Sequence, residues 1–456
     1  MNKKLGPIHV WALGVGIVLV GEFMGWNMTV KLGGSYASLI GMWIIAIMYS
    51  MIVSMTNEMA AVMPEAGGQY TMAKCLLGPL AAFNIGLMMV LEYAMLEAAD
   101  ALVVGQLLQT LNPNIQTLPF LLLTLLALTY LNYHGAYASL TLNFFITAFA
   151  FCCVIVLLFA TNFYDPQATL LQLKELTNGI PFGLLGVFAA LQFSCWFFLG
   201  IEGTAMTADE CRSPHRSLPV GAMVGLSTLL IGGTVTWFVC SGLIDAHTLG
   251  DSVYPLFDAA VATGKLFVVI ALFIGTMLAC LASANGCIND ASRAWSVLSR
   301  DGLLPDAFAK IHPKYGSPYR ALLFLVPISI VFALTGMLDY IVTFSIFSAL
   351  MVYLLTAIMM LRFRRKYPLG RIARGYTSPL HPLPALLTIA LIGCTLFGMY
   401  LNYWKSMVAA TLFYLLSSVW FMKRRSCHVD RSAFGRLDTS SLSRDGISPS
   451  VTDSVQ

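Results

Sequence analysis

Glutamates inside long apolar segments are the residues of this chain with the clearest capacity for chemistry. Glu202 follows Gly200 within an apolar segment that runs from residue 181 to residue 208, and Glu22 follows Gly21 in a similar segment much earlier in the chain. An ionisable group at membrane depth is costly and marks a functional-site hypothesis. Glycine loosens a helix there, and irregular backbone is tolerated in a bilayer only where it lines a cavity or is buried in protein. Two such segments predict a transporter site formed by broken helices.

Membrane-spanning helices must position these residues, because the chain is far more apolar than a soluble globular protein. Hydrophobic residues make up 58% of the 456 residues, and charged residues make up 11%. Long apolar runs recur, and each approaches the length of about 20 residues that a spanning helix needs. The sequence therefore predicts an all-α integral membrane protein, embedded in a lipid bilayer. We expect twelve transmembrane helices, at residues 9–30, 35–58, 80–110, 118–134, 138–161, 181–208, 219–243, 264–285, 319–336, 339–361, 381–402 and 405–422.

Lys and Arg fall almost entirely on one side of these helices. With both termini in the cytoplasm, all 26 lie inside except Lys31, Lys174, Lys265 and Lys405. An excess of Lys and Arg marks the cytoplasmic side. We therefore expect a multi-pass protein of the cytoplasmic (inner) membrane. Its net charge of +4 reflects this topology and indicates no nucleic-acid partner, and its first apolar run is too long for a cleavable signal peptide.

The segments outside the helices follow from the same topology. Residues 1–8 form a cytoplasmic N-terminus, and residues 162–180 form an extracytoplasmic loop. Residues 423–456 are rich in Ser, Arg and Asp and poor in apolar residues. Such a composition cannot bury a core, so we expect a disordered cytoplasmic tail.

The third predicted helix, at residues 80–110, carries three acids. Glu92 lies about halfway along it and therefore close to the membrane midplane, whereas Glu97 and Asp100 lie nearer the outer surface. At helical spacing all three share one broad side. Glu92 is the best candidate for a binding role. For Glu97 and Asp100 a polar vestibule explains the charge as well as a binding role does.

Three connecting segments leave alternatives open. The run Pro64–Tyr70, with two glycines after a proline, is a tight connector or a hinge of the cytoplasmic gate. The outer segment 245–264 carries three aspartates and is a lid or an acidic rim that attracts cations. The small polar residues from Ser283 to Asp290, at the end of the eighth helix, line an inner pathway, coordinate an ion or serve ordinary helix packing.

The sequence indicates no metal site, no cofactor and no enzyme. Ten cysteines form no CxxC pair, and most fall in predicted helices, where a thiol acts as a small hydrophobic group. No nucleophile–base pair stands out. The coupling ion stays open between a proton and sodium, since residues 138–161 contain no lysine to replace sodium and Thr276 and Ser283 leave room for a sodium site. The oligomeric state is not readable.

Several motifs, in this order and spacing, resemble the amino acid–polyamine–organocation (APC) superfamily of permeases. They are Pro64–Tyr70, Gly200-Ile201-Glu202, Arg212-Ser213-Pro214 with Leu218-Pro219, and Ser299–Pro305. The resemblance implies a 5+5 inverted repeat with broken helices 1 and 6. Residues 9–161 would hold the first repeat and residues 181–361 the second, with helices 11 and 12 at residues 381–422. It also implies a substrate between the two breaks and an aromatic gate at Trp196.

The first break departs from the family pattern. Amino acid permeases usually carry a Gly-Ser-Gly-type run there, whose bare N–H groups hold the substrate carboxylate, whereas this chain has Leu19–Phe23 with Glu22. Two unit charges about 4 Å apart repel by on the order of 4 kcal/mol at an effective dielectric of about 20. The glutamate would therefore disfavour a carboxylate and favour an ammonium group. The run Gly21–Trp26 resembles the ethanolamine permease branch.

The leading hypothesis is therefore a secondary transporter that imports a small cationic amine, ethanolamine above all, by alternating access. The alternative is an amino acid or polyamine permease or exchanger of the same superfamily. A membrane sensor would carry a signalling domain, and a channel would show flux without saturation. The expected substrate-binding residues are Val20, Gly21, Glu22, Glu92, Trp196 and Gly200. The expected coupling and gating residues are Glu202, Trp196 and Ser283.

Overall fold

Helices account for the regular structure of this chain in a computed structural model that describes residues 5–424 except 66, 162–182, 337 and 373. The described residues form no strand. The first half contains α1 (Pro7–Val18), α2 (Val20–Phe23), α3 (Met28–Gly33), α4 (Ser35–Val62), α5 (Gln69–Leu76), α6 (Pro79–Gln109), α7 (Thr117–Tyr133) and α8 (Ala136–Ala160). The second half contains α10 (Gly183–Ser194), η2 (Cys195–Phe197), η3 (Ile201–Glu210), α11 (Pro214–Leu243), α12 (Ala246–Asp251), α13 (Pro255–Ala262), α14 (Leu266–Arg300), η4 (Asp306–Ala309), α15 (Tyr319–Leu334), α16 (Leu338–Lys366) and α17 (Leu383–Arg424).

The first apolar segment is interrupted later than its glycine–glutamate pair suggests. Gly21 and Glu22 are helical, within α2. The helix ends at Met24, whose backbone is extended (φ −155°, ψ 159°), and Gly25 follows with φ +85°. A left-handed φ of this kind is readily accessible only to glycine. The break therefore lies between Glu22 and α3, and the expectation that it includes Gly21 and Glu22 is wrong.

The segment at residues 181–208 breaks at the expected place. The α-helix α10 tightens into the 3₁₀ turn η2 at Cys195, and Gly200 adopts φ +101° before η3 begins. Runs of 3₁₀ helix longer than three or four residues are uncommon, and mid-helix stretches mark strain or a functional hinge. All ten residues of η3 are 3₁₀ in form, so the second half of this segment departs from α-helix throughout.

The eighth apolar segment is longer than its hydrophobicity indicates. The helix α14 continues to Arg300, so Asp290 lies inside it rather than after the expected end at residue 285. Its residues from Ala279 to Arg293 are buried apart from Leu281, which is half-buried. Contacts with neighbouring helices therefore sustain a helix through polar residues that a hydropathy argument treats as its end.

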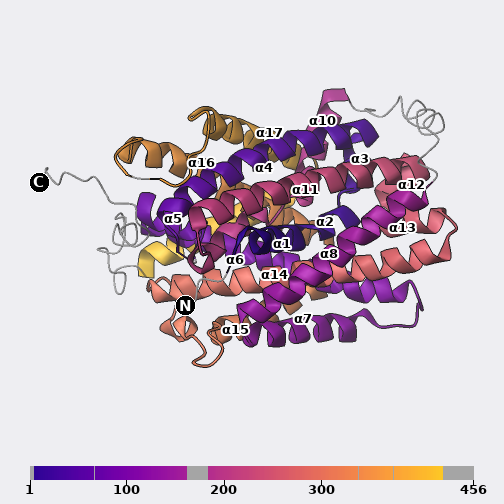
Figure 1. The fold of residues 1–456 in the computed structure, drawn as a ribbon, viewed down its shortest axis with the longest axis horizontal. Helices are drawn as coiled ribbons and strands as arrows, with labels where there is room; N and C mark the ends of the chain where they lie inside the picture. Colours follow the sequence, from indigo (N-terminus) through magenta and orange to yellow (C-terminus); the bar gives the residue numbers. More distant parts are fainter. Residues whose placement is uncertain (1–4, 66, 162–182, 337, 373, 425–456) are drawn as a thin grey trace, which may run out of the picture.

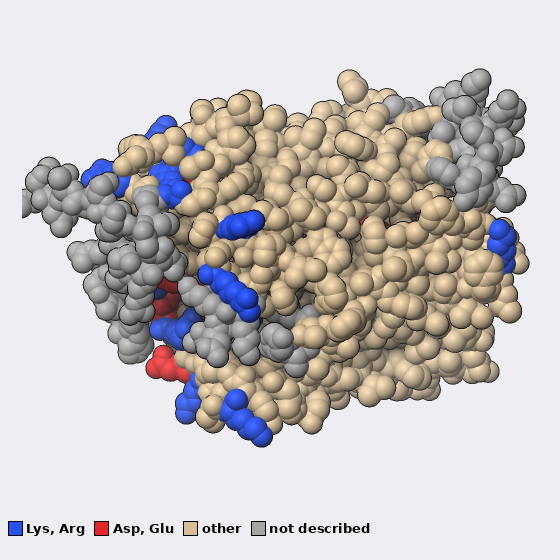
Figure 2. All heavy atoms as spheres, in the orientation of Figure 1, with Lys and Arg blue, Asp and Glu red and all other residues tan. Residues whose placement is uncertain are grey.

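The pattern of length and apolarity is that of a multi-pass membrane protein. Among the described residues, seven helices are long and apolar enough to cross a membrane, and the shorter apolar helices are Pro7–Phe23, Thr117–Tyr133 and Tyr319–Leu334. The helix α6 is also long enough to cross a membrane, and it carries the three buried acids Glu92, Glu97 and Asp100. In α17 a non-helical residue, Tyr403 (φ −132°), separates the two apolar runs of the C-terminal region. On the face in Figure 2, the visible Lys and Arg lie mainly toward one end, with a wide band free of them.

The first broken segment, α1 and α2, lies in the middle of the helix bundle (Figure 1). The helix α1 packs against α11, α8 and α14, while α14 packs against α6 and α8. The 3₁₀ helix η3 contacts α1, α4 and α11. Both helix breaks are therefore enclosed by long helices from both halves of the chain. The predicted extracytoplasmic loop at 162–180 and most of the predicted tail at 423–456 lie outside the described residues.

Candidate functional site

The two helix breaks touch each other directly. A Cβ atom on Gly21 would lie 3.0 Å from the carbonyl carbon of Trp196 and closer still to its oxygen. A Cβ atom on Gly25 would lie 2.8 Å from Nε1 of the Trp196 indole ring. Both positions therefore need glycine, because Trp196 leaves no room for a Cβ atom at either of them. This contact joins Gly21 of α2, next to Val20, and Gly25 of the first break to Trp196 of η2.

Aromatic side chains line this contact. The Trp196 ring covers Gly25 and is only 3% exposed, and the rings of Trp26 and Phe197 lie 5.7 Å apart. Within the described part of the chain, neither the Nε1 atom of Trp196 nor that of Trp26 has a hydrogen-bond partner. A buried N–H group without an acceptor is costly. The contact therefore offers two donors to a polar molecule that enters between the breaks.

Glu22 points away from this contact, toward α11. A Cβ atom on Gly232 would lie 2.5 and 2.6 Å from the two carboxyl oxygens of Glu22, so glycine at that position makes the space for the carboxyl group. Glu22 is fully buried, and neither oxygen has a hydrogen-bond partner among the described residues. No other titratable group of the described chain acts on it. Glu22 therefore faces Gly232 of α11, and a shared site with Glu92 and Glu202 stays a prediction.

Glu92 and Glu202 come together from α6 and η3. Their carboxyl groups interact directly, and the Tyr353 hydroxyl of α16 lies beside that of Glu202. Both glutamates are buried, and neither oxygen of Glu202 accepts a hydrogen bond of ordinary geometry within the described chain. The N–H groups of Gly200 and Glu202 also face this carboxyl group, at the start of η3. Negative charge is favoured at such a position because the N–H groups there carry partial positive charge.

Asp290 of α14 extends this acidic region on the inner side. Its Oδ2 atom approaches the backbone of Gly203, where the Tyr93 hydroxyl also lies within 3.0 Å of an added Cβ atom. The side-chain amide of Asn289 donates to its Oδ1 atom at 3.0 Å. The sequence placed Asp290 in a run of small polar residues without giving it a role. The signal that could have identified Asp290 is that it is an acid in a helix that is buried along most of its length.

A second acidic region lies farther along α6. Ser283 of α14 faces the Asp100 carboxyl group, and Ser329 of α15 donates a hydrogen bond to Glu97. Glu97 and Asp100 also interact with each other. Ser283 therefore belongs to the surroundings of Asp100, and its expected coupling role is open.

An ion pair and a glycine turn lie where η3 meets the second half of α14. Arg293 of α14 pairs with Glu210 at 2.5 Å and donates to the Met206 carbonyl oxygen at 3.3 Å. Gly68, with φ +50°, lies against the Met206 side chain. The run Pro64–Tyr70 therefore packs on η3, which is compatible with either a connector or a hinge.

A further contact ties α5 to the end of α14. Asp301 accepts a hydrogen bond from the Tyr70 hydroxyl at 2.6 Å and pairs with Lys74 at 2.9 Å. Burial and the neighbouring Asp301 carboxylate raise the pKa of the Tyr70 hydroxyl far above its usual range, so Tyr70 acts there as a neutral donor. This contact anchors the turn that precedes α5.

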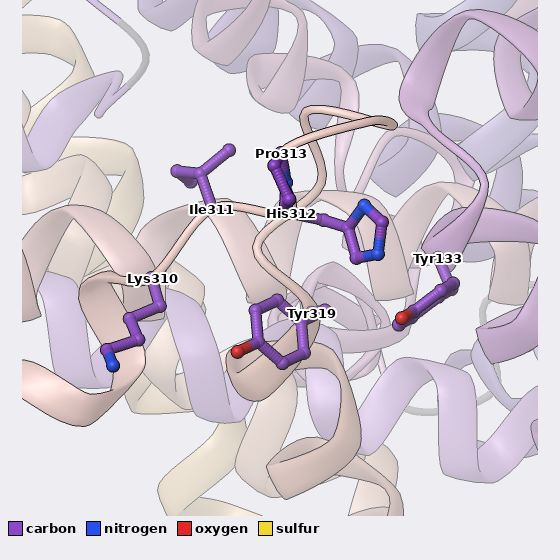
Figure 3. Close-up of a pocket in the computed structure, with 6 residues that line it drawn as sticks. All are labelled: Tyr133, Lys310, Ile311, His312, Pro313 and Tyr319. Atoms are coloured by element: carbon purple, nitrogen blue, oxygen red, sulfur yellow. The ribbon is translucent and has the colours of Figure 1, made fainter.

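A surface pocket of about 360 Å³ lies elsewhere, between the end of α7 and the start of α15. Figure 3 shows its lining residues, which are Tyr133, Lys310, Ile311, His312, Pro313 and Tyr319. None of the predicted site residues lines it. It is therefore separate from the helix breaks and from the buried acids. Among the described residues, no group of three or more His, Cys, Asp or Glu side chains has the geometry to hold a metal ion.

Comparison with known proteins covers almost the whole chain. The model of a family described as amino acid permease matches residues 8–427. An uncharacterized transporter of Rhizobium meliloti (strain 1021) is 48% identical over 435 residues, which is 94% of this chain and 93% of that protein. The branched-chain amino acid permease BcaP of Bacillus subtilis (strain 168) is 24% identical over 92% of each chain. The methylthioribose transporter of the same organism is 23% identical over 92% of this chain and 94% of its own length.

Proposed function

Because this chain belongs to the amino acid permease family, we propose that it is a secondary transporter that moves an amino acid across a membrane by alternating access. The family consists of transporters, and the protein is not an enzyme. Its helices make it a multi-pass membrane protein. We also propose the class of the substrate, the roles of the site residues and the detailed topology.

The buried pair of Glu92 and Glu202 is the observation that carries the proposal. Two carboxyl groups held together away from water are destabilised by mutual repulsion and by lost solvation unless a proton or a cation joins them. Among the described residues, the basic side chain that acts on neighbouring Asp290 is Arg293, and it is already paired with Glu210. The ammonium group of a substrate supplies the missing positive charge.

An amino acid fits the surroundings better than ethanolamine does. The prediction of ethanolamine assumed that Glu22 repels a carboxylate at the first break. Glu22 instead faces Gly232 on α11, and the break follows it. The argument against a substrate carboxylate therefore loses its geometric basis. The relatives named for branched-chain amino acids and for methylthioribose lend ethanolamine no support, and the amino acid alternative becomes the main proposal.

The proposed roles follow from position. Trp196 closes over a substrate that enters between the breaks, beside Val20, Gly21 and Gly200. Glu92 and Glu202 receive its ammonium group, and Glu202 also exchanges a proton during the cycle. Glu22 acts apart from them, on the moving contact between α2 and α11. Trp196 and the three glutamates are buried, and each has a side-chain atom without a hydrogen-bond partner among the described residues.

The proposed architecture is that of twelve spans arranged as a 5+5 inverted repeat, with residues 9–161 and 181–361 as the two repeats and helices 11 and 12 after them. The non-helical Tyr403 within α17 and the breaks after α2 and α10 support this count. We place both termini in the cytoplasm and the protein in the cytoplasmic membrane, which the bias of Lys and Arg supports.

Counterflow in proteoliposomes tests the proposal. Vesicles that contain the purified protein are loaded with one unlabelled amino acid and assayed for uptake of the same labelled compound, across a panel of branched-chain, small neutral and cationic amino acids. Saturable exchange of at least one of them, reduced in Glu92→Gln and Glu202→Gln, is expected. Asp339→Asn serves as the matched control, since Asp339 is exposed at the start of α16. Exchange of ethanolamine or putrescine without any amino acid would overturn the amino acid assignment.

A further inference from the structure

The interface between α6 and α14 carries a row of polar groups that the proposed substrate site does not use in full. On α14, Cys280, Ser283, Cys287 and Asp290 recur at intervals of three and four residues, which places them on one face of the helix. These four side chains are all buried. The two helices pack along each other for much of their length. The acids of α6 interact with this face of α14.

The outer end of the row is the pair formed by Glu97 and Asp100. Each side chain is only 1% exposed. Ser329 donates to one oxygen of Glu97, and the other oxygen has no partner among the described residues. Neither oxygen of Asp100 makes a hydrogen bond of ordinary geometry in that part of the chain, and the hydroxyl that faces it belongs to Ser283. A buried carboxyl group in this state calls for a proton, a water molecule or a cation.

Cys287 joins the outer pair to the inner acids. Its thiol lies within electrostatic reach of Glu92, Glu97, Asp100 and Asp290. The two acidic regions on α6 are thus neighbours on either side of one side chain. Beyond Asp290, the row ends at Arg293 and its partner Glu210.

The chemistry of the row favours a proton over a metal ion. The described residues hold no cluster with the geometry of a metal site. Carboxyl groups can pass a proton between their oxygens, directly or through water, and chains of Asp and Glu mark proton relays in membrane transporters. No bond other than O–H forms or breaks, so each proton that enters at one end is balanced by one that leaves at the other.

Several helices packed around this row contribute groups that act on its charge. Around Asp100 and Glu97 these are Cys280, Ser283, Cys287 and Ser329. Around the inner acids they are Tyr49, Tyr93, Tyr353, Tyr414, Asn289, Arg293 and Glu210. Among these named groups Arg293 is the cationic one, and it belongs to the set around the inner acids. The outer half of the row therefore has no fixed positive charge among the described residues to hold two carboxylates ionised.

We propose that Asp100 and Glu97 form the outer half of a proton path that runs along the α6–α14 interface, past Cys287, to the Glu92–Glu202 pair and Asp290. This inference rests on the proposed transport function and names its coupling ion. Asp100 and Glu97 act on transport through the inner acids and do not touch the substrate.

Proteoliposomes loaded with a pH-sensitive dye separate the two halves of the coupled reaction. Amino acid exchange without a pH gradient reports the substrate cycle, and accumulation driven by an inward proton gradient, with dye response, reports proton entry. Asp100→Asn and Glu97→Gln should lower gradient-driven accumulation on the order of 100-fold, the lower range for a positioned proton-transfer group, and leave exchange close to wild type. Asp100→Glu should restore accumulation, and Asp339→Asn should change neither.

Three results would overturn the path. One is wild-type accumulation and proton entry in Asp100→Asn and Glu97→Gln, and another is equal loss of exchange and accumulation in folded variants. The third is amino acid exchange by the wild type without proton entry, which would overturn the proton path and leave the proposed transport function intact. A wild type that exchanges no amino acid would overturn both the proton path and the proposed transport function. If the acid variants do not fold, Ser329→Ala decides, because it removes the donor to Glu97 and should shift the pH profile of accumulation only.

Discussion

Replacing Gly21 with alanine tests whether the two helix breaks must touch during transport. Gly21 is helical, within α2, so the substitution brings no penalty for a left-handed backbone. Alanine is favoured over glycine in a helix by about 1 kcal/mol. A loss of function in this variant would therefore come from the contact with Trp196 and not from the helix itself.

The size of the effect follows from the contact. The new Cβ atom would lie 3.0 Å from the carbonyl carbon of Trp196 and closer to its oxygen. Carbon and oxygen atoms normally stay about 3.3 Å apart or more, so the breaks must separate by about 1 Å. The nearest Trp196 atoms belong to its backbone carbonyl group, so rotation of the Trp196 side chain does not relieve the clash. Overpacking of this kind costs about 1–3 kcal/mol, which corresponds to a shift of about 5–150-fold between two conformations.

The assay is amino acid counterflow in proteoliposomes, with thermal unfolding in detergent measured alongside. The matched control is Gly393→Ala in α17, where an added Cβ atom meets nothing within 4 Å. We expect Gly21→Ala to slow exchange by about 5–150-fold, while Gly393→Ala exchanges like the wild type. Exchange at the wild-type rate in Gly21→Ala would refute the reasoning, because it would mean that no rate-limiting state holds the breaks in contact.

Three further changes probe the acids and the outer segment. Gly232→Ala places a Cβ atom 2.5 Å from a Glu22 oxygen and must displace that carboxyl group. The counterflow rate of this variant should fall on the order of tenfold, the effect of about 1.4 kcal/mol, and should match the rate of Glu22→Gln. Unequal losses in the two variants would contradict a role of Gly232 through Glu22. The double variant of Glu92→Gln with Glu202→Gln should show a coupling energy of about 0.5–3 kcal/mol in apparent substrate affinity, and strictly additive losses would argue against a shared cation. Asp245 caps α12 by accepting hydrogen bonds from the N–H groups of His247 and Thr248 at 3.1 and 3.0 Å. Asp245→Ala should weaken α12 by about 0.5–1 kcal/mol, the lower range for an exposed cap, and amide hydrogen exchange in α12 should become faster. Asp245→Asn should keep the protection of the wild type. The hydrogen bonds with Thr248 lower the pKa of Asp245, so this stabilisation is present above the ordinary carboxyl pKa and is lost as the pH falls through the lowered value; protection that persists in acid would contradict it.

Local composition was sufficient for the helical, multi-pass class of the protein and for one of the two breaks. Apolar runs near the length of a membrane span determine where helices form, because backbone groups in a bilayer must bond within their own segment. Gly200 interrupts its segment with a φ of +101°. Glycine adopts such an angle readily, and the glycine itself can be read from the sequence. Trp196 could likewise be singled out, because it stands a few residues before that glycine.

Packing decided the first break. Gly21 looked like its centre, yet it is helical, and glycine is needed there because the Trp196 carbonyl group lies against it. Gly25 takes the left-handed backbone instead. The same two glycines have different reasons to be glycine, and only the contact partner distinguishes them. The continuation of α14 to Arg300 through polar residues has a similar cause, since burial against neighbouring helices outweighs its local polarity.

The sequence by itself determined that this protein is a helical membrane protein with costly buried acids on its first, third and sixth apolar segments. It did not determine which acids meet. Glu92 and Glu202 are far apart in the chain and become neighbours through the packing of α6 and η3, while Glu22 turns toward the space left by Gly232. Periodicity reports which face of a helix is apolar, but the partner of each face depends on how the helices assemble. The acids were therefore readable from the sequence, and their pairing belongs to the tertiary structure.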